Sequence, residues 1–437
     1  MHPSDIDPYF TERAVQMNFP TKVLQMLGIG NKNRLIAGAA LLLSLFVLQS
    51  CLYMLEKKNN KFKDIDEDDI AAAFSDGTRT LPVIFLDTDH GNGINNKEYW
   101  KEAEIKIYTV QGHTKDIDIE IKGRGNSTWS FPKKPFNLRF KDSYSLLGLP
   151  EAKKFCALAN WRDRTRIRNA VALEIARQTS MEWTPQGFFA DLIVDDDWYG
   201  NFYFTEKVAP EKLGLRHGGF ILLVDDHYNE TYRFRSKVRS LPVNIIVEEN
   251  AALDAAAFSS IRKTVDKVED ALYNNIGNWL DLIDLQSFCD WFIIHELTGS
   301  DEPSDPKGVY MYCRGDGIIH AGPCWDYDYH TFRTGTTSVT NAGAVWFGNL
   351  LKRPEFKNML KSRWAHIKPL VEENIPPFIE QLKEELHESV NTDHQLWPYK
   401  IITTNGDESL SFEDAVSRLQ AGLSERIAIL DTYCSNL

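Results

Sequence analysis

The sequence predicts an α+β fold, with strands mainly in the N-terminal half of the chain and helices mainly in the C-terminal half. Apolar residues alternate with polar ones at residues 104–110 and 116–122, which is typical of half-buried antiparallel strands. From Phe258 onward, apolar residues recur every three or four positions, which is the period of a helix that packs on a core. Hydrophobic residues make up 43% of the 437 residues, so the chain can bury one large core or several smaller ones.

The N-terminal end has the features of a targeting segment. Lys32 and Arg34 precede an uncharged apolar run at residues 35–47, which is shorter than the ~20 residues of a membrane-spanning helix. The run leads into the tetrapeptide Leu-Gln-Ser-Cys, which ends at Cys51 and resembles the lipidation signal of bacterial lipoproteins. We therefore expect residues 1–51 to be a signal segment with lipidation at Cys51, or alternatively an uncleaved membrane anchor. Either one predicts a protein of the cell envelope, anchored to a membrane outside the cytoplasm.

The rest of the chain is expected to consist of a linker and one folded domain. In residues 52–80 a block of lysines is followed by a block of carboxylates without apolar periodicity, which is typical of a tether. Folding should begin at Leu81. The predicted domain, 81–437, comprises a β-rich lobe (81–225), a core lobe with the candidate metal site (226–335) and a helical C-terminal part (336–437).

Capping residues and prolines indicate where several helices begin. Residues 160–169 contain four arginines and lead into a helix that Asp163 can cap. The arginines have carboxylate or phosphate partners or, alternatively, lie on a solvated helix start. In the C-terminal part we expect separate helices from Pro354, from Pro377 and at residues 412–433.

Charge and cysteine content narrow the class of protein. A net charge of −13 argues against a general nucleic-acid binder, so no nucleic-acid partner is expected. Of the six cysteines, five remain when Cys51 is set aside, without a Cys-x-x-Cys pair or a histidine at metal-ligand spacing. We expect mostly buried thiols and at most one disulfide.

A basic, glycine-containing loop connects two predicted strands. Residues 123–129 read Gly-Arg-Gly-Asn-Ser-Thr-Trp, and further basic residues follow up to Arg139. Glycines let backbone N–H groups approach a phosphate, and the side chains of Asn126 and Ser127 add donors. The loop is therefore either a phosphate-binding element or an ordinary hairpin connection.

Two aspartates stand between aromatic residues in the stretch Gly317–Phe332. At the period of a strand, Asp326 and Asp328 point to one side, while Trp325, Tyr327 and Tyr329 anchor the other. Two carboxylates held this close favour a divalent cation with oxygen ligands, although two solvated aspartates at a strand end are the alternative. A preceding strand at 309–312 would bring the acidic loop 300–308 near them.

Taken together and in order, the motifs of this chain resemble the spore-coat-protein-H (CotH) kinase family. The resemblance covers about residues 81–433 and implies a two-lobed atypical protein-kinase fold that binds ATP with Mg²⁺ or Mn²⁺. It also implies transfer of the γ-phosphate to Ser or Thr of a partner protein, whose identity the sequence does not give. The motifs that carry it are Arg124-Gly-Asn-Ser-Thr-Trp with Lys133-Lys134-Pro-Phe, Asn160-Trp-Arg-Asp163, Glu206-Lys207, Glu296-Leu-Thr-Gly299 and Gly322-Pro-Cys-Trp-Asp-Tyr-Asp328.

The resemblance also implies roles for individual residues. Phosphoryl transfer needs donors for the nucleotide, carboxylates for the metal and a carboxylate that orients the attacking hydroxyl. The implied residues are Arg124, Asn126, Ser127 and Glu206 for the nucleotide with Lys134 or Arg139 as phosphate partner, Asp326 assisted by Asp328 for the metal, and Glu302 or Asp301 for the hydroxyl.

The acidic loop departs from the family pattern. Family members carry an Asp two residues after an Asn, whereas this chain has Ser300 and Glu302 with Asp301 between them, and a later Asn is replaced by Gly308. Either Glu302 or Asp301 has taken the catalytic role, or transfer is impaired. The alternative function is a catalytically weak or inactive, surface-anchored structural or binding protein that retains the kinase-like fold. Metal-dependent hydrolysis of phosphoesters is a third possibility for the same carboxylates.

Overall fold

The computed structural model describes residues 62–91, 93–248, 251–398 and 405–437. The signal segment, Cys51 and the first part of the predicted linker lie outside these residues. The chain divides into two compact units, Met1–Asp64 and Ile65–Leu437, and every element named below belongs to the second unit. The prediction of an α+β fold with a β-rich N-terminal part and a helical C-terminal part is confirmed.

A short helix occupies part of the segment predicted to be a linker. Helix α4 (Glu67–Ser75) begins after Asp66, whose side chain accepts a hydrogen bond from the Asp68 N–H group. Glu67 forms an ion pair with Lys106 at 2.8 Å, and Ile70 is buried. The charge blocks of this segment therefore include a capped helix that contacts the first sheet.

The first sheet closes on itself as a cylinder of seven strands with one added edge strand. The strand order is β1-β7-β8-β6-β5-β4-β2-β3, and β1 closes the ring because it pairs parallel with β7 and antiparallel with β2. Alternating residues such as Ile119, Ile121 and Leu138 fill one apolar core. The strands are β1 (Val83–Thr88), β2 (Lys101–Thr109), β3 (Gly112–His113), β4 (Ile117–Gly123), β5 (Phe136–Tyr144), β6 (Ala152–Leu158), β7 (Gly187–Val194) and β8 (Asp197–Glu206).

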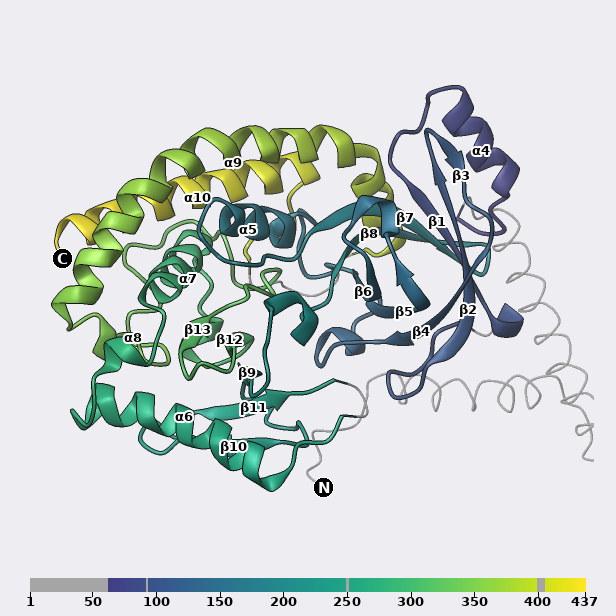
Figure 1. Cartoon of the computed structure of the whole chain (residues 1–437). Coiled ribbons are helices and arrows are strands. Elements are labelled where there is room, and N and C mark those ends of the chain that lie inside the picture. The colour runs from purple at the N-terminus through teal and green to yellow at the C-terminus, as the bar shows by residue number, and fades with distance from the viewer. Residues whose placement is uncertain (1–61, 92, 249–250, 399–404) are drawn as a thin grey trace, which may run out of the picture. The chain divides into compact units, whose positions relative to one another are not determined.

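A second sheet and three helices form the middle of the chain (Figure 1). The sheet has the order β10-β11-β9-β12-β13. Helix α7 is buried from Phe288 to its end at Gly299, whose φ of 66° is a left-handed conformation that glycine tolerates. The elements are α5 (Arg168–Arg177), β9 (Phe220–Val224), β10 (Arg233–Arg235), β11 (Pro242–Ile246), α6 (Ala255–Tyr273), α7 (Leu285–Thr298), β12 (Val309–Cys313) and β13 (Ile319–Ala321).

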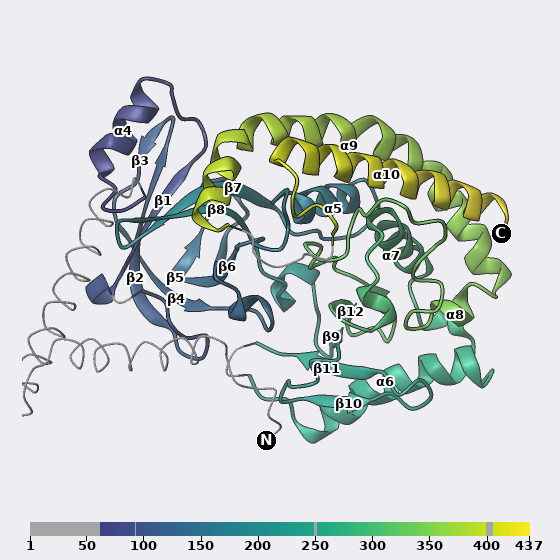
Figure 2. The same ribbon diagram turned by 180° about the vertical axis from the view of Figure 1, so that it is seen from behind.

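The C-terminal part consists of a short helix, α8 (Phe347–Leu350), and two long helices that run side by side (Figures 1 and 2). The prediction of separate helices from Pro354 and Pro377 is wrong, because α9 (Pro354–Leu396) continues through three internal prolines. Each internal proline removes a backbone hydrogen bond. Buried residues on both sides of the prolines, including Ile367 and Ile379, pack on the core and outweigh this loss. The last helix is α10 (Phe412–Ser435).

Six single-turn 3₁₀ helices complete the described structure. They connect strands or follow longer helices, as is usual for this conformation. They are η1 (Asp89–Gly91), η2 (Thr128–Ser130), η3 (Leu146–Gly148), η4 (Pro210–Leu213), η5 (Trp279–Asp281) and η6 (Glu302–Ser304).

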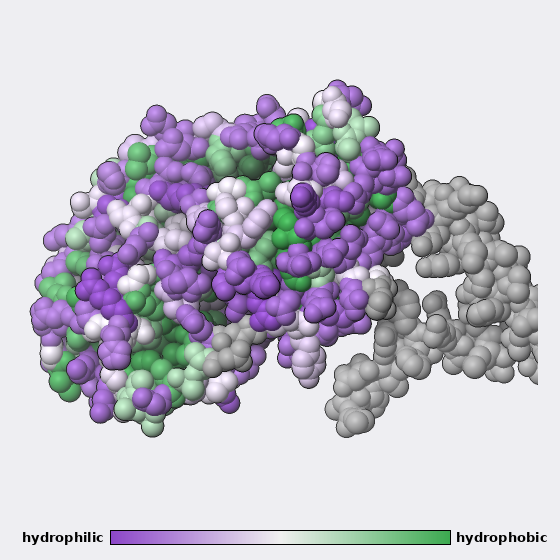
Figure 3. All heavy atoms as spheres, turned by 45° about the vertical axis from the view of Figure 1, so that its right-hand side comes forward, coloured by the Kyte–Doolittle hydropathy of each residue, from purple (hydrophilic) through white to green (hydrophobic). Residues whose placement is uncertain are grey.

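The hydrophilic surface and the buried cysteine side chains are those that the composition of the sequence predicts. Hydrophilic residues predominate on the face drawn in Figure 3. Within the part of the chain that the structure describes, no helix has both the length and the apolar character needed to cross a membrane. The five described cysteines are free and buried, which confirms the expectation of buried thiols.

A buried ionic cluster joins the end of α9 to the loop that follows β4. The Asp393 carboxylate contacts the Lys133 ammonium at 2.6 Å and the Arg166 guanidinium at 2.8 Å, and all three side chains are almost fully buried. It also accepts a hydrogen bond from the backbone N–H of Asn201 at 3.0 Å. Burial alone would raise the pKa of Asp393, but the two cations lower it below its usual value. The cluster therefore fixes Lys133, and with it the basic loop, to α9.

We predict that Asp393→Ala lowers the free energy of unfolding by about 3–5 kcal/mol, because Lys133 and Arg166 are left as buried charges without their partner. Chemical denaturation of the full chain, followed by tryptophan fluorescence, measures the change. Glu384→Gln, at an exposed position of the same helix, is the matched control and should change stability by less than about 0.5 kcal/mol. A loss in Asp393→Ala as small as that of the control would contradict the role of the cluster.

Candidate functional site

A polar cavity of about 480 Å³ lies between the closed sheet and the second sheet. Its walls come from segments far apart in the sequence: the loop after β4, the end of β6, the end of β9, the loop after α7 and the loop after β13. Cations and hydrogen-bond donors line one part, and carboxylates line another. This is the cavity in which the basic loop and the aspartates of the sequence analysis meet.

Four carboxylates from three elements line the cavity. Asp225 directly follows β9, Glu302 begins η6, and Asp326 and Asp328 follow β13. Asp225 is held by the backbone N–H groups of His227 at 2.6 Å and Gly308 at 2.9 Å. Because β9 and β12 are neighbours in the sheet, the segments that carry these carboxylates lie close together.

Burial raises the pKa values of three of these carboxylates, Glu302, Asp326 and Asp328. Burial raises the pKa of Glu302 to about 9, and the negative charges of Asp326 and Asp328 add to this effect. Burial raises the pKa of Asp328 to about 8, with a further contribution from Asp326. Asp326 reaches solvent through the cavity, yet burial by the surrounding protein still raises its pKa, while Arg124 and a hydrogen bond with Asp328 oppose the shift. Without a bound cation, these groups cannot all be ionised at neutral pH.

The loop that carries Asp326 and Asp328 is not a strand. The expectation that the two aspartates follow the period of a strand is wrong, because Asp326 has a φ of 70°, which is a left-handed and not an extended conformation. Pro323 has no N–H group with which to continue the ladder. The loop is held instead by Tyr327, which is buried and whose backbone N–H donates to Asn169 Oδ1 at 2.7 Å. Both carboxylates still face the cavity.

The basic part of the cavity centres on Arg124. The Arg124 guanidinium lies over the Trp325 ring, 5.6 Å from its centroid, and favours the ionised form of Asp326. Asn126 and Ser127 line the same wall, as expected for the loop after β4. Lys133 also lines the cavity, although its ammonium group is fixed to Asp393.

Four residues proposed from the sequence do not line the cavity. Lys134 donates to the backbone carbonyl of Trp129 at 2.6 Å. The Arg139 guanidinium binds Glu120 at 2.6 Å, and Glu206 binds Lys212 at 2.7 Å. Asp301 is paired with Arg333 and His330, each at 2.8 Å, whereas its neighbour Glu302 lines the cavity.

The sequence reasoning missed other residues of the cavity. Asp225 is not among the site residues that the sequence predicts, although a carboxylate directly after a strand is itself a signal for a site. Of the two adjacent lysines, the sequence analysis named Lys134 as a phosphate partner, whereas Lys133 is the one that lines the cavity. Arg162, from the arginine-rich segment, lines the cavity beside Phe131 and Tyr329, with its guanidinium 4.5 Å and 5.3 Å from the two ring centroids. These contacts hold the guanidinium at the cavity wall.

The donor set fits a hard divalent cation. No three His, Cys, Asp or Glu side chains are arranged around one point at metal-ligand distances in the described ranges. However, the cavity contains four carboxylates, and carboxylate oxygens are the ligands that Mg²⁺ and Mn²⁺ prefer. Burial and the neighbouring carboxylates raise the pKa values of Glu302 and Asp328, so a bound cation would favour their ionised forms.

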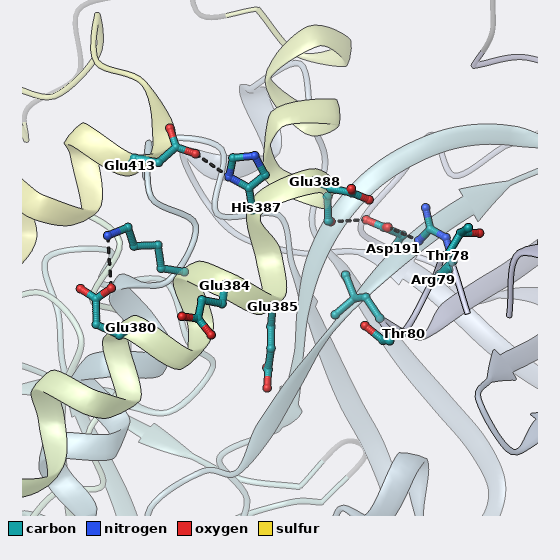
Figure 4. Close-up of a pocket in the computed structure, with 13 residues that line it drawn as sticks. Thr78, Arg79, Thr80, Asp191, Glu380, Glu384, Glu385, His387, Glu388 and Glu413 are labelled. Carbon is teal, nitrogen blue, oxygen red and sulfur yellow. Dashed lines mark hydrogen bonds and ion pairs between the residues drawn. The ribbon is translucent and has the colours of Figure 1, made fainter. Parts of the chain in front are cut away.

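A second cavity, of about 590 Å³, differs in chemistry (Figure 4). Six carboxylates line it, four of them glutamates of α9: Glu380, Glu384, Glu385, Glu388, Asp191 and Glu413. The basic side chains in its wall are already paired, Arg79 with Asp191 at 2.7 Å, Lys383 with Glu380 at 3.2 Å and His387 with Glu413 at 2.6 Å. An anionic nucleotide would meet an excess of negative charge here, so the first cavity is the candidate active site.

A closed β-rich part, a helical part and a polar cavity between the two sheets are consistent with a kinase-like fold. A family model described as CotH kinase protein matches residues 121–430. The chain therefore belongs to the CotH kinase family. Membership implies an atypical kinase and, in general terms, the use of ATP and a metal ion. No curated protein matches the chain.

We predict that Glu302→Gln makes the metal-free protein more stable at high pH. The pKa of Glu302 is about 9 in the folded protein, so the folded state keeps a proton that the unfolded chain releases near pH 4.5. Stability of the wild type therefore falls as the pH rises between these two values, and the amide variant loses this contribution. At pH ~9 the variant should be more stable by at least about 1 kcal/mol, with little difference at pH ~5.

Chemical denaturation of the full chain with a chelator at both pH values measures this difference. Glu151→Gln, an exposed carboxylate outside the cavity, is the control and should show no pH-dependent gain. The same pH dependence in wild type and Glu302→Gln would show that Glu302 is not crowded by other carboxylates.

Proposed function

We propose that this protein binds ATP with Mg²⁺ or Mn²⁺ and transfers the γ-phosphate to a Ser or Thr hydroxyl of a protein acceptor. The single observation that carries the proposal is one cavity that combines Arg124 and the donors of its loop with the four carboxylates. Phosphoryl transfer needs little covalent chemistry from the protein and depends on positioning and on charge stabilisation. Family membership supports the same reaction class.

Asp326 is the proposed principal ligand of the metal ion, with Asp328 and Asp225 in support. A bound divalent ion neutralises negative charge on the phosphates during transfer. Arg124, beside Asp326, is placed to contact a phosphate, because its guanidinium is fixed over Trp325 rather than paired with a carboxylate at short distance. Asn126 and Ser127 offer further donors from the same loop.

Glu302 is the proposed residue that orients the acceptor hydroxyl. It lies in the cavity, whereas the two oxygens of Asp301 are taken by His330 and Arg333. An ionised Glu302 carboxylate can accept a hydrogen bond from the acceptor hydroxyl and later its proton. Neighbouring Lys307 favours that ionised form and therefore opposes the rise in the pKa of Glu302.

We also propose where in the cell the protein lies. The apolar run at residues 35–47 followed by Cys51 supports attachment of the kinase to the cell envelope by lipid or by an uncleaved anchor. If Cys51 carries the lipid, the full chain expressed in bacteria should be labelled with radioactive palmitate and Cys51→Ser should not. Absence of label in both proteins indicates an uncleaved anchor.

A structural or binding protein is a second candidate function. Gly308, where family members have an Asn, offers no side-chain oxygen, and its N–H group is used by Asp225. The carbonyl of Ser300 accepts a hydrogen bond from the Asn341 side chain at 2.9 Å, so this part of the loop is committed to structure. These departures favour a retained fold without transfer.

We predict that the full chain, incubated with γ-labelled ATP and Mn²⁺, labels itself or a generic protein acceptor on Ser or Thr. Asp326→Asn should reduce labelling by at least about 100-fold, because the metal loses its principal charged ligand. Absence of nucleotide binding by the folded wild type at millimolar ATP would remove the kinase proposal. Free phosphate released without an acceptor would instead indicate phosphoester hydrolysis.

The same assay separates the two neighbouring carboxylates. Glu302→Gln should lose about 100-fold or more of the labelling while keeping its affinity for ATP, and Asp301→Asn, the matched variant one residue away, should keep most activity. Loss in Asp301→Asn with activity retained in Glu302→Gln would reverse the assignment. Full labelling in both variants would place the catalytic carboxylate elsewhere.

A further inference from the structure

A smaller pocket of about 290 Å³ adjoins the candidate active site. Both pockets are lined by Arg124, Gly125, Tyr310 and Trp325, so these residues form the boundary at which the two pockets adjoin. The floor of the smaller pocket is a row of three neighbouring strands. Lys122 on β4 is opposite Asn137 on β5, which is opposite Cys156 on β6. The pocket is thus built on the rigid closed sheet.

Four cations converge on this pocket from separate segments. Lys97, before β2, reaches the carbonyl oxygen of Gly125 at 3.2 Å, and the Lys122 ammonium lies 4.6 Å from the centroid of the Trp100 ring. Arg124 and Lys207 complete the set. None of the described residues that line the pocket is an aspartate or a glutamate. In a chain of net charge −13, this local excess of positive charge stands out against the rest of the surface.

Lys207 is the most informative of these cations. It follows β8 at a largely buried position, and no carboxylate within the described ranges lies at ion-pair distance from it. Burial lowers the pKa of Lys207, and the nearby cations Lys154, Arg124 and Lys122 lower it further. Burying a cation among other cations is unfavourable unless an anion binds there.

We propose that Lys97, Lys122, Arg124 and Lys207 form a phosphate subsite, which holds a phosphoryl group other than the one being transferred. The proposal rests on the proposed kinase function and extends it to residues outside the active-site cavity. Several converging N–H donors suit the many acceptor oxygens of a phosphoryl group. Its source is either the non-transferred phosphates of ATP or a phosphoryl group that the acceptor already carries.

Isothermal titration calorimetry of the full chain with inorganic pyrophosphate, without ATP and metal, tests the subsite. Lys122→Gln/Lys207→Gln should weaken pyrophosphate binding by at least about tenfold, since two charge-assisted contacts are lost. Lys153→Gln, an exposed lysine on β6, is the matched control and should bind as the wild type does. Lys97→Gln, at the pocket edge, should show a smaller loss and replaces the double variant if that variant fails to fold. Equal binding in wild type and variants overturns the proposal.

Three further titrations identify the source. If ATP supplies the group, the double variant loses affinity for ATP while its affinity for adenosine is unchanged. If the acceptor supplies it, ATP affinity is unchanged and a phosphoserine peptide binds more weakly. Either result supports the subsite. If the double variant loses pyrophosphate binding but the wild type labels no acceptor, only the kinase proposal is removed. If the wild type labels an acceptor and the double variant binds pyrophosphate as the wild type does, only the subsite is removed.

Discussion

The repulsion among carboxylates in one cavity is the constraint on which the functional interpretation depends. Asp225, Glu302, Asp326 and Asp328 are delivered by the end of a strand, a 3₁₀ turn and a loop. These elements belong to one sheet and to the turn after the helix α7, so the fold holds the carboxylates around one cavity. Burial, and after it the charges of neighbouring carboxylates, raise the pKa values of Glu302 and Asp328 and favour their protonated forms in the metal-free protein. A divalent cation would relieve the repulsion and would release those protons.

Buried ion pairs hold the cationic side of the site in place. Asp393 binds Lys133 and Arg166 in the interior, and Arg168 binds Asp407 at 2.6 Å in a second buried pair. These ion pairs connect the basic loop and the start of α5 to the C-terminal part of the chain. Their desolvation makes them weak evidence for net stability, but they specify one arrangement of the segments around the cavity. A site assembled from distant segments requires such specification.

Local sequence patterns predicted many of the strands and helices. Which of the basic residues line the cavity depends on tertiary contacts that such patterns do not contain. Alternation at Ile119 and Ile121 gave a strand whose apolar side does face the core. Lys133 and Lys134 are equivalent by type, but Lys133 lines the cavity and pairs with Asp393, some 260 residues later in the chain, whereas Lys134 donates to the nearby carbonyl of Trp129. Arg139 lies on β5 two residues after Asn137, and its guanidinium binds Glu120 on the neighbouring strand β4. No local pattern contains such long-range partners, and the same holds for the parallel pairing of β1 with β7 that closes the sheet.

The central claim is that basic donors and carboxylates from distant segments converge on one metal–nucleotide complex. Anomalous diffraction from crystals soaked with ATP and Mn²⁺ tests it most directly, because the signal locates the ion without assumptions about the ligands. We predict a manganese peak within about 2.2 Å of an Asp326 carboxylate oxygen, with nucleotide phosphates beside Arg124. An ion bound away from Asp326, or a nucleotide in a different cavity, would contradict the account.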